Sequence, residues 1–218
     1  MILKFQSRYS KKFLAFCAIW AFFWLAFSYF FLQKFLFIYP ESFSIHVRFA
    51  LCAIALGAAI LAVCGKDIYG AVCGYAVWFY GAALGFVSSL NLAKIHTVLR
   101  GSGDMSGMSG CGGAVRFLNF DLSAVQIFKP FNSCAFDVPA VPAGTALEGL
   151  QAKLTALYSG GWYLFPTSKS VDLAQFWSFI FIFFAIIWMI GIFLGFINKR
   201  AWDLSPTQNR LLDDNKSV

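Results

Sequence analysis

Residues 13–32 read FLAFCAIWAFFWLAFSYFFL and contain no charged side chain. A helix needs roughly 20 mostly apolar residues to cross the hydrocarbon core of a membrane, so this stretch predicts a membrane span. Three further apolar runs, at about 46–64, 69–92 and 173–197, are long enough to do the same. The sequence therefore predicts an all-α membrane protein, a four-transmembrane-helix bundle that forms a single membrane domain over residues 1–218.

The composition agrees with a membrane protein. Hydrophobic residues make up 60% of the chain and charged residues 12%, whereas soluble domains average about 45–50% and about 25%. This difference argues against a water-soluble monomer. The net charge of +7 comes mainly from residues that flank the spans, and no soluble basic patch indicates nucleic-acid binding. The predicted spans contain no acidic residue, which argues against an ion-coupled transporter.

The basic residues predict how the chain is oriented. They gather beside the first and last spans, at Lys4, Arg8, Lys11 and Lys12 and at Lys199, Arg200, Arg210 and Lys216. Lys and Arg near span ends mark the cytoplasmic side, so we expect both termini, the tail 198–218 and the turn 65–67 in the cytoplasm. The loops 34–45 and 93–172 then face the periplasm of a bacterium, and the protein lies in the inner membrane.

The N-terminal span also resembles a signal peptide, because Ala26-Phe27-Ser28 is a weak small-x-small cleavage site. The apolar run before this site is longer than a signal-peptide core, and it continues past the site. We therefore expect the segment to stay in the protein as a span.

The long loop, residues 93–172, predicts several short elements. A glycine- and serine-rich run from Arg100 to Gly113 predicts a flexible connector. Asp121, or Asn119, is placed to cap a short helix within 115–131, and residues 138–142 predict an extended segment. Thr145 and Glu148 form a capping-box pattern that predicts a helix to about Tyr158, ended by Gly160-Gly161. We expect Trp162 and Tyr163 at the membrane interface.

The loop carries the two cysteines with the clearest chemical potential, Cys111 and Cys134. The other four lie in or at the ends of apolar runs. A disulfide between Cys111 and Cys134 would stabilise this segment by roughly 3 kcal/mol, because it lowers the conformational entropy of the unfolded chain. Two interpretations stay open: a structural disulfide, and an exposed, reducible disulfide that exchanges with other thiols.

Arg48 is the second candidate, at the outer mouth of the second span. An arginine in or near a span often marks a ligand or a pathway, and the alternative is an interface anchor whose head group reaches water. Cys52 lies on the same helical face, four residues on. His46 and His96, the two histidines of the chain, have no ligand cluster near them in the sequence, so we predict no metal site.

Several motifs together resemble one family. They are Tyr39-Pro40, Arg48-Phe49-Ala50, Gly110-Cys111, Phe128-Lys129-Pro130, Cys134-Ala-Phe-Asp137, Pro139-Ala-Val-Pro142-Ala-Gly144 and Gly161-Trp-Tyr-Leu-Phe-Pro166. With four spans, a short first loop and a long second loop, this set resembles the DsbB/DsbI family of bacterial inner-membrane disulfide-bond-forming proteins. The resemblance is closest to the DsbI branch and covers most of the chain.

The resemblance implies an electron path. A periplasmic thioredoxin-like partner of the DsbA or DsbL type gives electrons to the second-loop disulfide, which here is Cys111–Cys134. They then pass to a Cys-x-x-Cys pair in the first loop and on to a quinone, either ubiquinone or menaquinone. The family's quinone-binding arginine corresponds to Arg48.

The sequence departs from this pattern in the first loop. After Pro40, where the family has Cys-x-x-Cys, it has Glu41, Ser42, Phe43 and Ser44. Glu41 and Ser44 cannot form a disulfide, so the relay to quinone lacks its sulfur atoms. Three explanations stay open. The chain is an engineered variant, or it is a natural paralogue that exchanges disulfides without quinone or only binds partners, or Cys52 takes the place of the missing cysteines.

We therefore expect a membrane thiol-disulfide oxidoreductase that re-oxidises a periplasmic dithiol partner through Cys111–Cys134. The alternative is a redox-silent membrane scaffold in which this disulfide only braces the loop.

Overall fold

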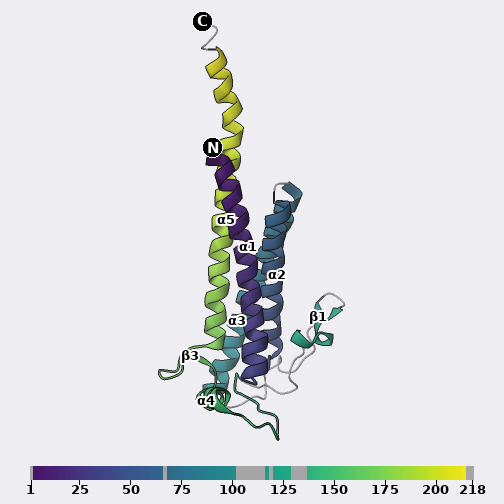
Figure 1. Cartoon of the computed structure of the whole chain (residues 1–218), viewed down its shortest axis with the longest axis vertical. Helices are drawn as coiled ribbons and strands as arrows, with labels where there is room; N and C mark the ends of the chain where they lie inside the picture. The colour runs from purple at the N-terminus through teal and green to yellow at the C-terminus, as the bar shows by residue number, and fades with distance from the viewer. Residues whose placement is uncertain (1, 66–67, 102–115, 118–119, 129–136, 215–218) are drawn as a thin grey trace.

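The structure is a computed structural model that describes residues 2–65, 68–101, 116–117, 120–128 and 137–214. Four long helices lie side by side and form the bundle (Figure 1). They are α1 (Ile2–Ala26), which continues as the π-helix η1 (Phe27–Phe35), α2 (Ser42–Cys64), α3 (Ile68–Gly101) and α5 (Leu173–Asp214). Each contains an apolar stretch long enough to cross a membrane, so the prediction of four spans in an all-α bundle is confirmed.

Three of the four spans extend farther toward the connecting loops than predicted, whereas the fourth begins at the predicted residue 173. The apolar stretches are Lys11–Phe35, Ser42–Cys64, Ile68–Thr97 and Leu173–Phe193. The predicted loop boundaries at 34, 45 and 93 are therefore wrong by a few residues. Lys34 and Lys94 lie inside helices with exposed side chains, because a long lysine can stay in a helix while its ammonium group reaches water.

The bundle has a loop end, which carries residues 36–41 and the described parts of 116–172, and a terminal end, where α1 begins and α5 ends (Figure 1). α2 packs against α1 and α3, and α3 packs against α5. Along the spans the helices approach closely at glycine. A Cβ atom on Gly57 would lie 2.6 Å from the Trp78 backbone nitrogen, and one on Gly81 would lie 2.8 Å from the Ala50 carbonyl oxygen. The small residues Gly57 and Gly81 thus let α2 and α3 pack closely.

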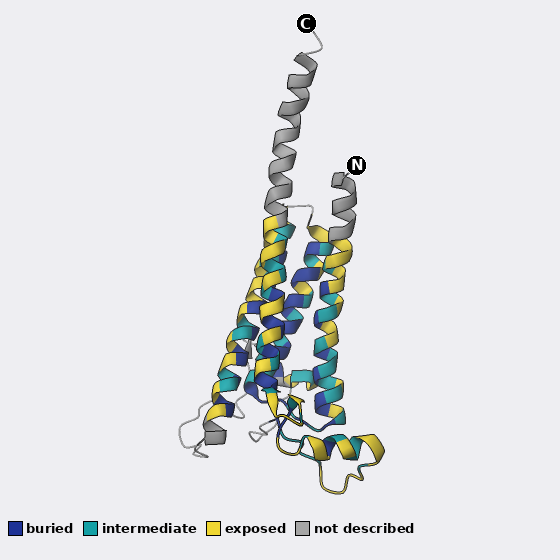
Figure 2. Ribbon diagram, turned by 90° about the vertical axis from the view of Figure 1, so that its left-hand side faces the viewer, coloured by how far each residue is buried: buried dark blue, intermediate teal, exposed yellow. Residues whose placement is uncertain are grey.

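Burial follows the pattern of a membrane protein, with large side chains both inside and outside. Trp78, Trp177 and Phe181 are fully buried, whereas Phe22, Phe30 and Phe179 are largely exposed. Figure 2 shows buried positions between the helices and exposed positions along their outer faces. Lipid tails can accept an apolar outer surface that water would not.

The loop end consists of short elements. The strands β1 (Arg116–Phe117) and β2 (Phe120–Asp121) pair antiparallel and lead into two 3-10 turns, η2 (Leu122–Ala124) and η3 (Gln126–Phe128). The helix α4 (Gly149–Leu157) follows, and β3 (Tyr163–Phe165) pairs antiparallel with β4 (Ser170–Asp172) before α5 begins. The predicted short helix after Asp121 is therefore a pair of 3-10 turns.

The helix predicted from Thr145 begins later, at Gly149. Thr145 belongs to a turn in which its N–H donates to the Pro142 carbonyl, and Glu148 is extended and makes no side-chain cap. The capping-box prediction is wrong, because Thr145 is part of this turn and the helix begins after it. The predicted end is confirmed, since Gly161 N–H closes a turn onto Tyr158. Trp162 is buried against Phe176 and does not lie at the surface.

Candidate functional site

The two loop cysteines, Cys111 and Cys134, lie outside the described residues, as do the connector from 102 to 113 and Lys66-Asp67 of the predicted turn. The structure does describe Ile127 and Asp137 on either side of Cys134 in the sequence. Ile127 makes a partly buried contact with the bundle, and Asp137 makes a buried one. These contacts, with Glu41 and Ser44 of the first loop, define the candidate site at the loop end.

Arg48 is the best-fixed polar residue of this region. Its side chain is only 2% exposed, and its guanidinium group donates four hydrogen bonds. Nε donates to Ser28 Oγ (2.8 Å) and Nη2 to the Ser28 carbonyl (3.1 Å). Nη1 donates to Gln33 Oε1 and to the Ile127 carbonyl, both at 2.6 Å. Arg48 therefore joins three segments: the end of the first span, α2 and the second loop.

The π-helix η1 explains why Ser28 and Gln33 can reach the same guanidinium group. In an α-helix, two residues five positions apart point about 140° away from each other. A π-helix forms i to i+5 hydrogen bonds, as in the 3.0 Å bond from Leu36 N–H to the Phe31 carbonyl. This winding stacks residue i+5 above residue i and brings the two side chains to one face.

This geometry rules out the interface-anchor interpretation of Arg48, because the head group does not reach water. It also uses most of the donors of the side chain. A guanidinium group has five N–H donors, and four are occupied by oxygen atoms of the chain itself. One N–H on Nη2 remains for any other acceptor.

Glu41 and Ser44 lie at the start of α2, about two helical turns and one helical turn before Arg48. Glu41 occupies the N-cap position with an extended backbone and is 3% exposed, and Ser44 is half-buried in the first turn. A negative charge at this position interacts favourably with the helix dipole. The two positions thus lie next to each other at the loop end, but they bring no sulfur to it.

The first and second loops contact each other through the backbone. Ala140 N–H donates to the Phe37 carbonyl (2.9 Å), and Gln151 Nε2 of α4 donates to the Phe35 carbonyl (2.8 Å). On the other side, Leu122 packs on Ile45 of α2. The second loop therefore lies against the N-terminal end of α2, where Glu41 and Ser44 are.

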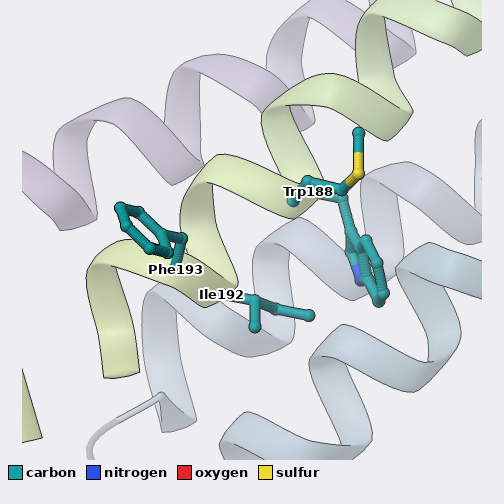
Figure 3. Close-up of a pocket in the computed structure, with 4 residues that line it drawn as sticks. Trp188, Ile192 and Phe193 are labelled. Carbon is teal, nitrogen blue, oxygen red and sulfur yellow. The ribbon is translucent and has the colours of Figure 1, made fainter. Parts of the chain in front are cut away.

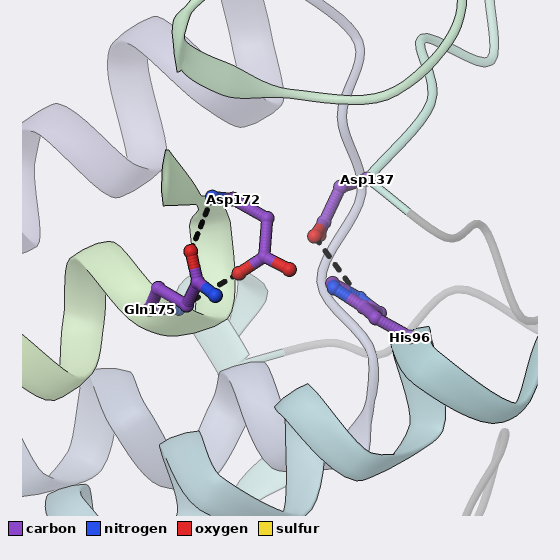
Figure 4. A network of polar contacts seen from close by, with 4 residues as sticks. All are labelled: His96, Asp137, Asp172 and Gln175. Atoms are coloured by element: carbon purple, nitrogen blue, oxygen red, sulfur yellow. Dashed lines mark hydrogen bonds and ion pairs between the residues drawn. The ribbon is translucent and has the colours of Figure 1, made fainter. Parts of the chain in front are cut away.

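A second buried polar group lies where α3 ends. His96 Nε2 is 3.1 Å from Asp137 Oδ2, with both side chains at most 6% exposed. Asp172 accepts a 2.8 Å hydrogen bond from Gln175 N–H at the start of α5, and Gln175 Oε1 accepts one from Asp172 N–H. In Figure 4 the second carboxylate oxygen of Asp172 points toward the His96–Asp137 pair. Three segments meet here: α3, the second loop and the beginning of α5.

Other features do not extend the site. Cys17, Cys52, Cys64 and Cys73 carry free thiols and all lie within the spans. Cys52 is eight residues from Ser44 on α2, or about 12 Å along the helix, and this distance argues against Cys52 as a substitute for a first-loop cysteine. An apolar recess lined by Trp188, Met189, Ile192 and Phe193 is formed by α5 alone, and the indole N–H of Trp188 is bonded to the Tyr75 carbonyl (Figure 3). Within the described ranges, no cluster of His, Cys, Asp and Glu is arranged to hold a metal ion.

Sequence reasoning missed most partners in this region. Ser28 and Gln33 are polar residues inside an apolar run, which is an available signal, but only the π-helical winding brings them together. Ile127 contributes a backbone carbonyl, for which a sequence carries no signal. His96 and Asp137 belong to residues already noted, yet their pairing depends on how the second loop folds back.

Comparison with known proteins places the chain among disulfide oxidoreductases. It is 34% identical over 170 residues to a protein named as the protein-disulfide oxidoreductase DsbI in Campylobacter fetus, covering 77% of this chain and 78% of that protein. It is 32% identical over 152 residues to the protein-disulfide oxidoreductase DsbI of Salmonella typhimurium, covering 66% and 68%. A DsbI protein of Campylobacter jejuni is 29% identical over 161 residues, covering 67% and 60%. No family model and no solved structure matches the chain.

Proposed function

This chain belongs to the DsbI branch of the DsbB/DsbI family of protein-disulfide oxidoreductases, and we propose that Cys111 and Cys134 form its reactive disulfide. The protein is a multi-pass membrane enzyme of disulfide bond formation. The observation that carries the proposal is the distribution of its cysteines. The four others lie within the membrane spans, whereas a disulfide that exchanges with another protein must be accessible from water.

The proposed reaction is a thiol-disulfide exchange. A thiolate of a thioredoxin-like dithiol partner attacks one sulfur of Cys111–Cys134, and the other loop sulfur leaves as a thiolate. The second thiol of the partner then attacks the mixed disulfide and releases the first loop cysteine. The partner gains a disulfide, and the loop takes up two electrons and two protons as two thiols. From the family resemblance, the partner is a periplasmic protein of the DsbA or DsbL type.

A quinone acceptor, ubiquinone or menaquinone, is implied by the resemblance, but the residues present do not fit a relay to it. Glu41 and Ser44 hold no sulfur, so electrons from the loop thiols have no disulfide to reduce beside Arg48. Arg48 itself has already committed four of its five N–H donors to the chain. We therefore derive no quinone step for this chain, and an exogenous oxidant has to restore Cys111–Cys134 between turnovers.

We further propose that the loop end faces the periplasm of a bacterial inner membrane and that both termini face the cytoplasm. The basic residues beside the first and last spans support this orientation. Single cysteines placed at Ser168, an exposed residue of the loop end, should react with a membrane-impermeant maleimide in spheroplasts. A reaction that requires broken membranes would reverse the orientation.

Thiol trapping tests the exchange directly. The purified oxidised chain is mixed with a stoichiometric amount of a reduced DsbA-type protein and quenched with acid and alkylating reagent. We expect a mixed disulfide that disappears in Cys111→Ser, Cys134→Ser or the double variant, and that persists in the matched control Cys52→Ser. Resistance of the loop disulfide to the reduced partner would exclude the proposed exchange.

Quinone turnover is tested separately. We expect the chain to give little or no reduction of added ubiquinone by the reduced partner. The double substitution Glu41→Cys and Ser44→Cys should raise this reduction, because it restores a disulfide at the start of α2. Rapid ubiquinone reduction by the unmodified chain would show that the missing sulfur atoms are not required.

The missing sulfur atoms at positions 41 and 44 also support a second candidate function, a redox-silent scaffold. In that case Cys111–Cys134 would only brace the second loop. The trapping experiment separates the two, because a bracing disulfide does not form a mixed disulfide with the partner.

A further inference from the structure

The hairpin of β3 and β4 takes no part in the exchange proposed above. It leads directly into a membrane span, because β4 ends at Asp172 and the apolar stretch of α5 begins at Leu173. Figure 1 shows the hairpin extending sideways from the start of α5, away from the bundle. A segment that leaves a membrane bundle sideways where a span begins lies in the headgroup region of the bilayer.

Aromatic contacts fix the level of the hairpin relative to the span. Trp162, which precedes β3, packs against Phe176 with ring centroids 5.3 Å apart, and it stacks on Tyr158 at the end of α4. Phe176 also contacts Trp24 of α1, with centroids 5.2 Å apart. At 1.5 Å per residue, Phe176 lies only about 5 Å along α5 from Leu173. β3 therefore starts at the depth of the first turn of the span.

The second strand is held at the same place. Asp172 and Gln175 bond to each other's backbone N–H groups, at 2.8 and 3.2 Å. Val171 has a φ of 58°, a backbone conformation that is rare for β-branched residues, so the chain turns sharply between the hairpin and the helix. Both strands are thus attached to the beginning of α5, and the bundle sets the direction of the hairpin.

The exposed side chains of β3 are apolar on both faces of the hairpin. Leu164 is 43% exposed and Phe165 is 56% exposed, and successive residues of a strand point to opposite faces. A hairpin that lay on a protein surface would have one of these faces covered. Apolar side chains exposed on both faces suit a hairpin that is surrounded by lipid at the membrane interface.

The polar groups of the hairpin also suit this environment. Ser168 Oγ donates to the Phe165 carbonyl (3.4 Å) and lies 2.8 Å from Ser170 Oγ. Hydroxyl groups that are paired within the protein cost less to bring near lipid than unpaired ones. The charged residues of the hairpin are Lys169, which is exposed, and Asp172, which is buried. The exposed charge is therefore positive, and an ammonium group binds phosphate.

We propose that the β3–β4 hairpin is a lipid anchor. Leu164 and Phe165 contact the acyl chains of phospholipids beside α5, and Lys169 contacts their phosphate groups. The anchor continues the lipid-facing surface of α5, on which Phe179 is 62% exposed. It holds the end of the second loop at the membrane surface. The proposal does not depend on disulfide exchange, so its test needs no redox partner.

Photo-crosslinking tests the contact with acyl chains. The full chain is placed in vesicles of phosphatidylethanolamine and phosphatidylglycerol, with p-benzoylphenylalanine in place of Leu164, of Phe165 or of a control residue. Lipid adducts are quantified by mass spectrometry after illumination. Phe179 is the positive control, and Ala146, an exposed residue of the second loop before α4, is the negative control.

Both hairpin positions should give about tenfold more lipid adduct than Ala146, because acyl chains reach the hairpin and not the outer part of the loop. A yield at Leu164 or Phe165 no higher than at Ala146 would overturn the proposal. Crosslinks to a second copy of the chain in place of lipid would also overturn it, since the hairpin would then be a protein contact.

The lipid composition of the adducts tests the role of Lys169. With p-benzoylphenylalanine in place of Phe165, Lys169→Gln should lower the ratio of phosphatidylglycerol to phosphatidylethanolamine adducts by about fivefold, the effect of one lysine at an anionic lipid surface. Lys153→Gln, which changes an exposed lysine of α4, is the matched control and should leave the ratio unchanged. An unchanged ratio in Lys169→Gln, or equal falls in both variants, would overturn the phosphate contact of Lys169.

Discussion

The two ends of the bundle are held together by different physical means. Toward the terminal end, α2 and α3 approach at glycine, so that a Cβ atom on Gly57 would lie 2.6 Å from a backbone nitrogen of the facing helix. At the loop end, buried Arg48, His96 and Asp137 make polar contacts between segments. Close packing fixes regular helices against each other, whereas irregular loops need directional bonds. The difference shows that buried polar groups of this protein hold the loops in position against the helices.

The largest effect should come from breaking the close packing. In Gly57→Val the added atoms would meet the backbone of Trp78 and the Gly74 carbonyl, which cannot move aside. Overpacking usually costs about 1–3 kcal/mol and occasionally more, and we expect about 4 kcal/mol here because rigid backbone is involved. Unfolding in mixed micelles measures the loss, with Ala59→Val on the exposed face of α2 as control. Equal stability of the two variants would show that the α2–α3 contact is not tight.

The second-largest effect should come from removing the polar contacts of Arg48. Arg48→Leu removes four hydrogen bonds and leaves the Gln33 side-chain oxygen and two carbonyls without this donor. Because each stranded buried group costs about 1–3 kcal/mol and such effects are not additive, we expect a loss of about 3 kcal/mol.

The same micelle unfolding applies to Arg48→Leu, with proteolysis of the second loop as a local measurement. Proteolysis should accelerate before the spans unfold, because the contact with Ile127 is lost first. Arg48→Lys should recover only part of the stability, since an ammonium group cannot reproduce the planar fork. Full recovery by lysine would mean that charge alone matters.

A smaller effect should come from the helix cap at the loop end. Asp172 and Gln175 satisfy each other's backbone N–H groups at the start of α5. Asp172→Ala should cost about 1 kcal/mol, the usual value of a lost N-cap, and Asp172→Asn should retain most of it. Amide hydrogen exchange in the first turn of α5 checks this, and unchanged protection in the alanine variant would contradict a capping role.

The smallest effect should come from a hydrogen bond inside the membrane. Ser178 Oγ lies 2.9 Å from Ser89 Oγ and 3.0 Å from the Ala174 carbonyl in its own helix. Ser178→Ala should therefore cost only about 0.6 kcal/mol, the average for such interhelical bonds. Micelle unfolding of Ser178→Ala with and without Ser89→Ala would show whether the two serines are coupled. If Ser178→Ala lowered the stability as much as Arg48→Leu does, polar contacts would matter as much inside the membrane as at the loop end.

The sequence predicts the bundle well because each span is a long uncharged run, and lipid requires such a run to be helical. It predicts the loop end poorly, because tertiary contacts decide between competing local patterns there. Thr145 and Glu148 match a capping pattern, yet the turn after Pro142 takes up Thr145, whereas the working cap, Asp172 with Gln175, follows a strand. A local sequence pattern cannot show which of two competing hydrogen-bond partners a residue will have, because tertiary contacts decide this.

The site shows the same limit. Arg48 stands out from the sequence as a charge in a span, but one of its acceptors is the Ile127 carbonyl, 79 positions away. A backbone oxygen looks the same at every residue, so only the folded loop identifies it. The lack of cysteine at Glu41 and Ser44 is the reverse case, since it is visible in the sequence alone.

The winding of Phe27–Phe35 bears on how this span tolerates changes of length. Removing one residue between Ser28 and Gln33 would leave them four apart, and on an ordinary α-helix such residues point only about 40° from each other. Excision of Phe30, whose ring is 65% exposed, would therefore relax the wide turn into a regular one and still aim both side chains at the guanidinium group. An insertion at the same place would swing them apart, so homologous chains should differ here by shortening and not by lengthening.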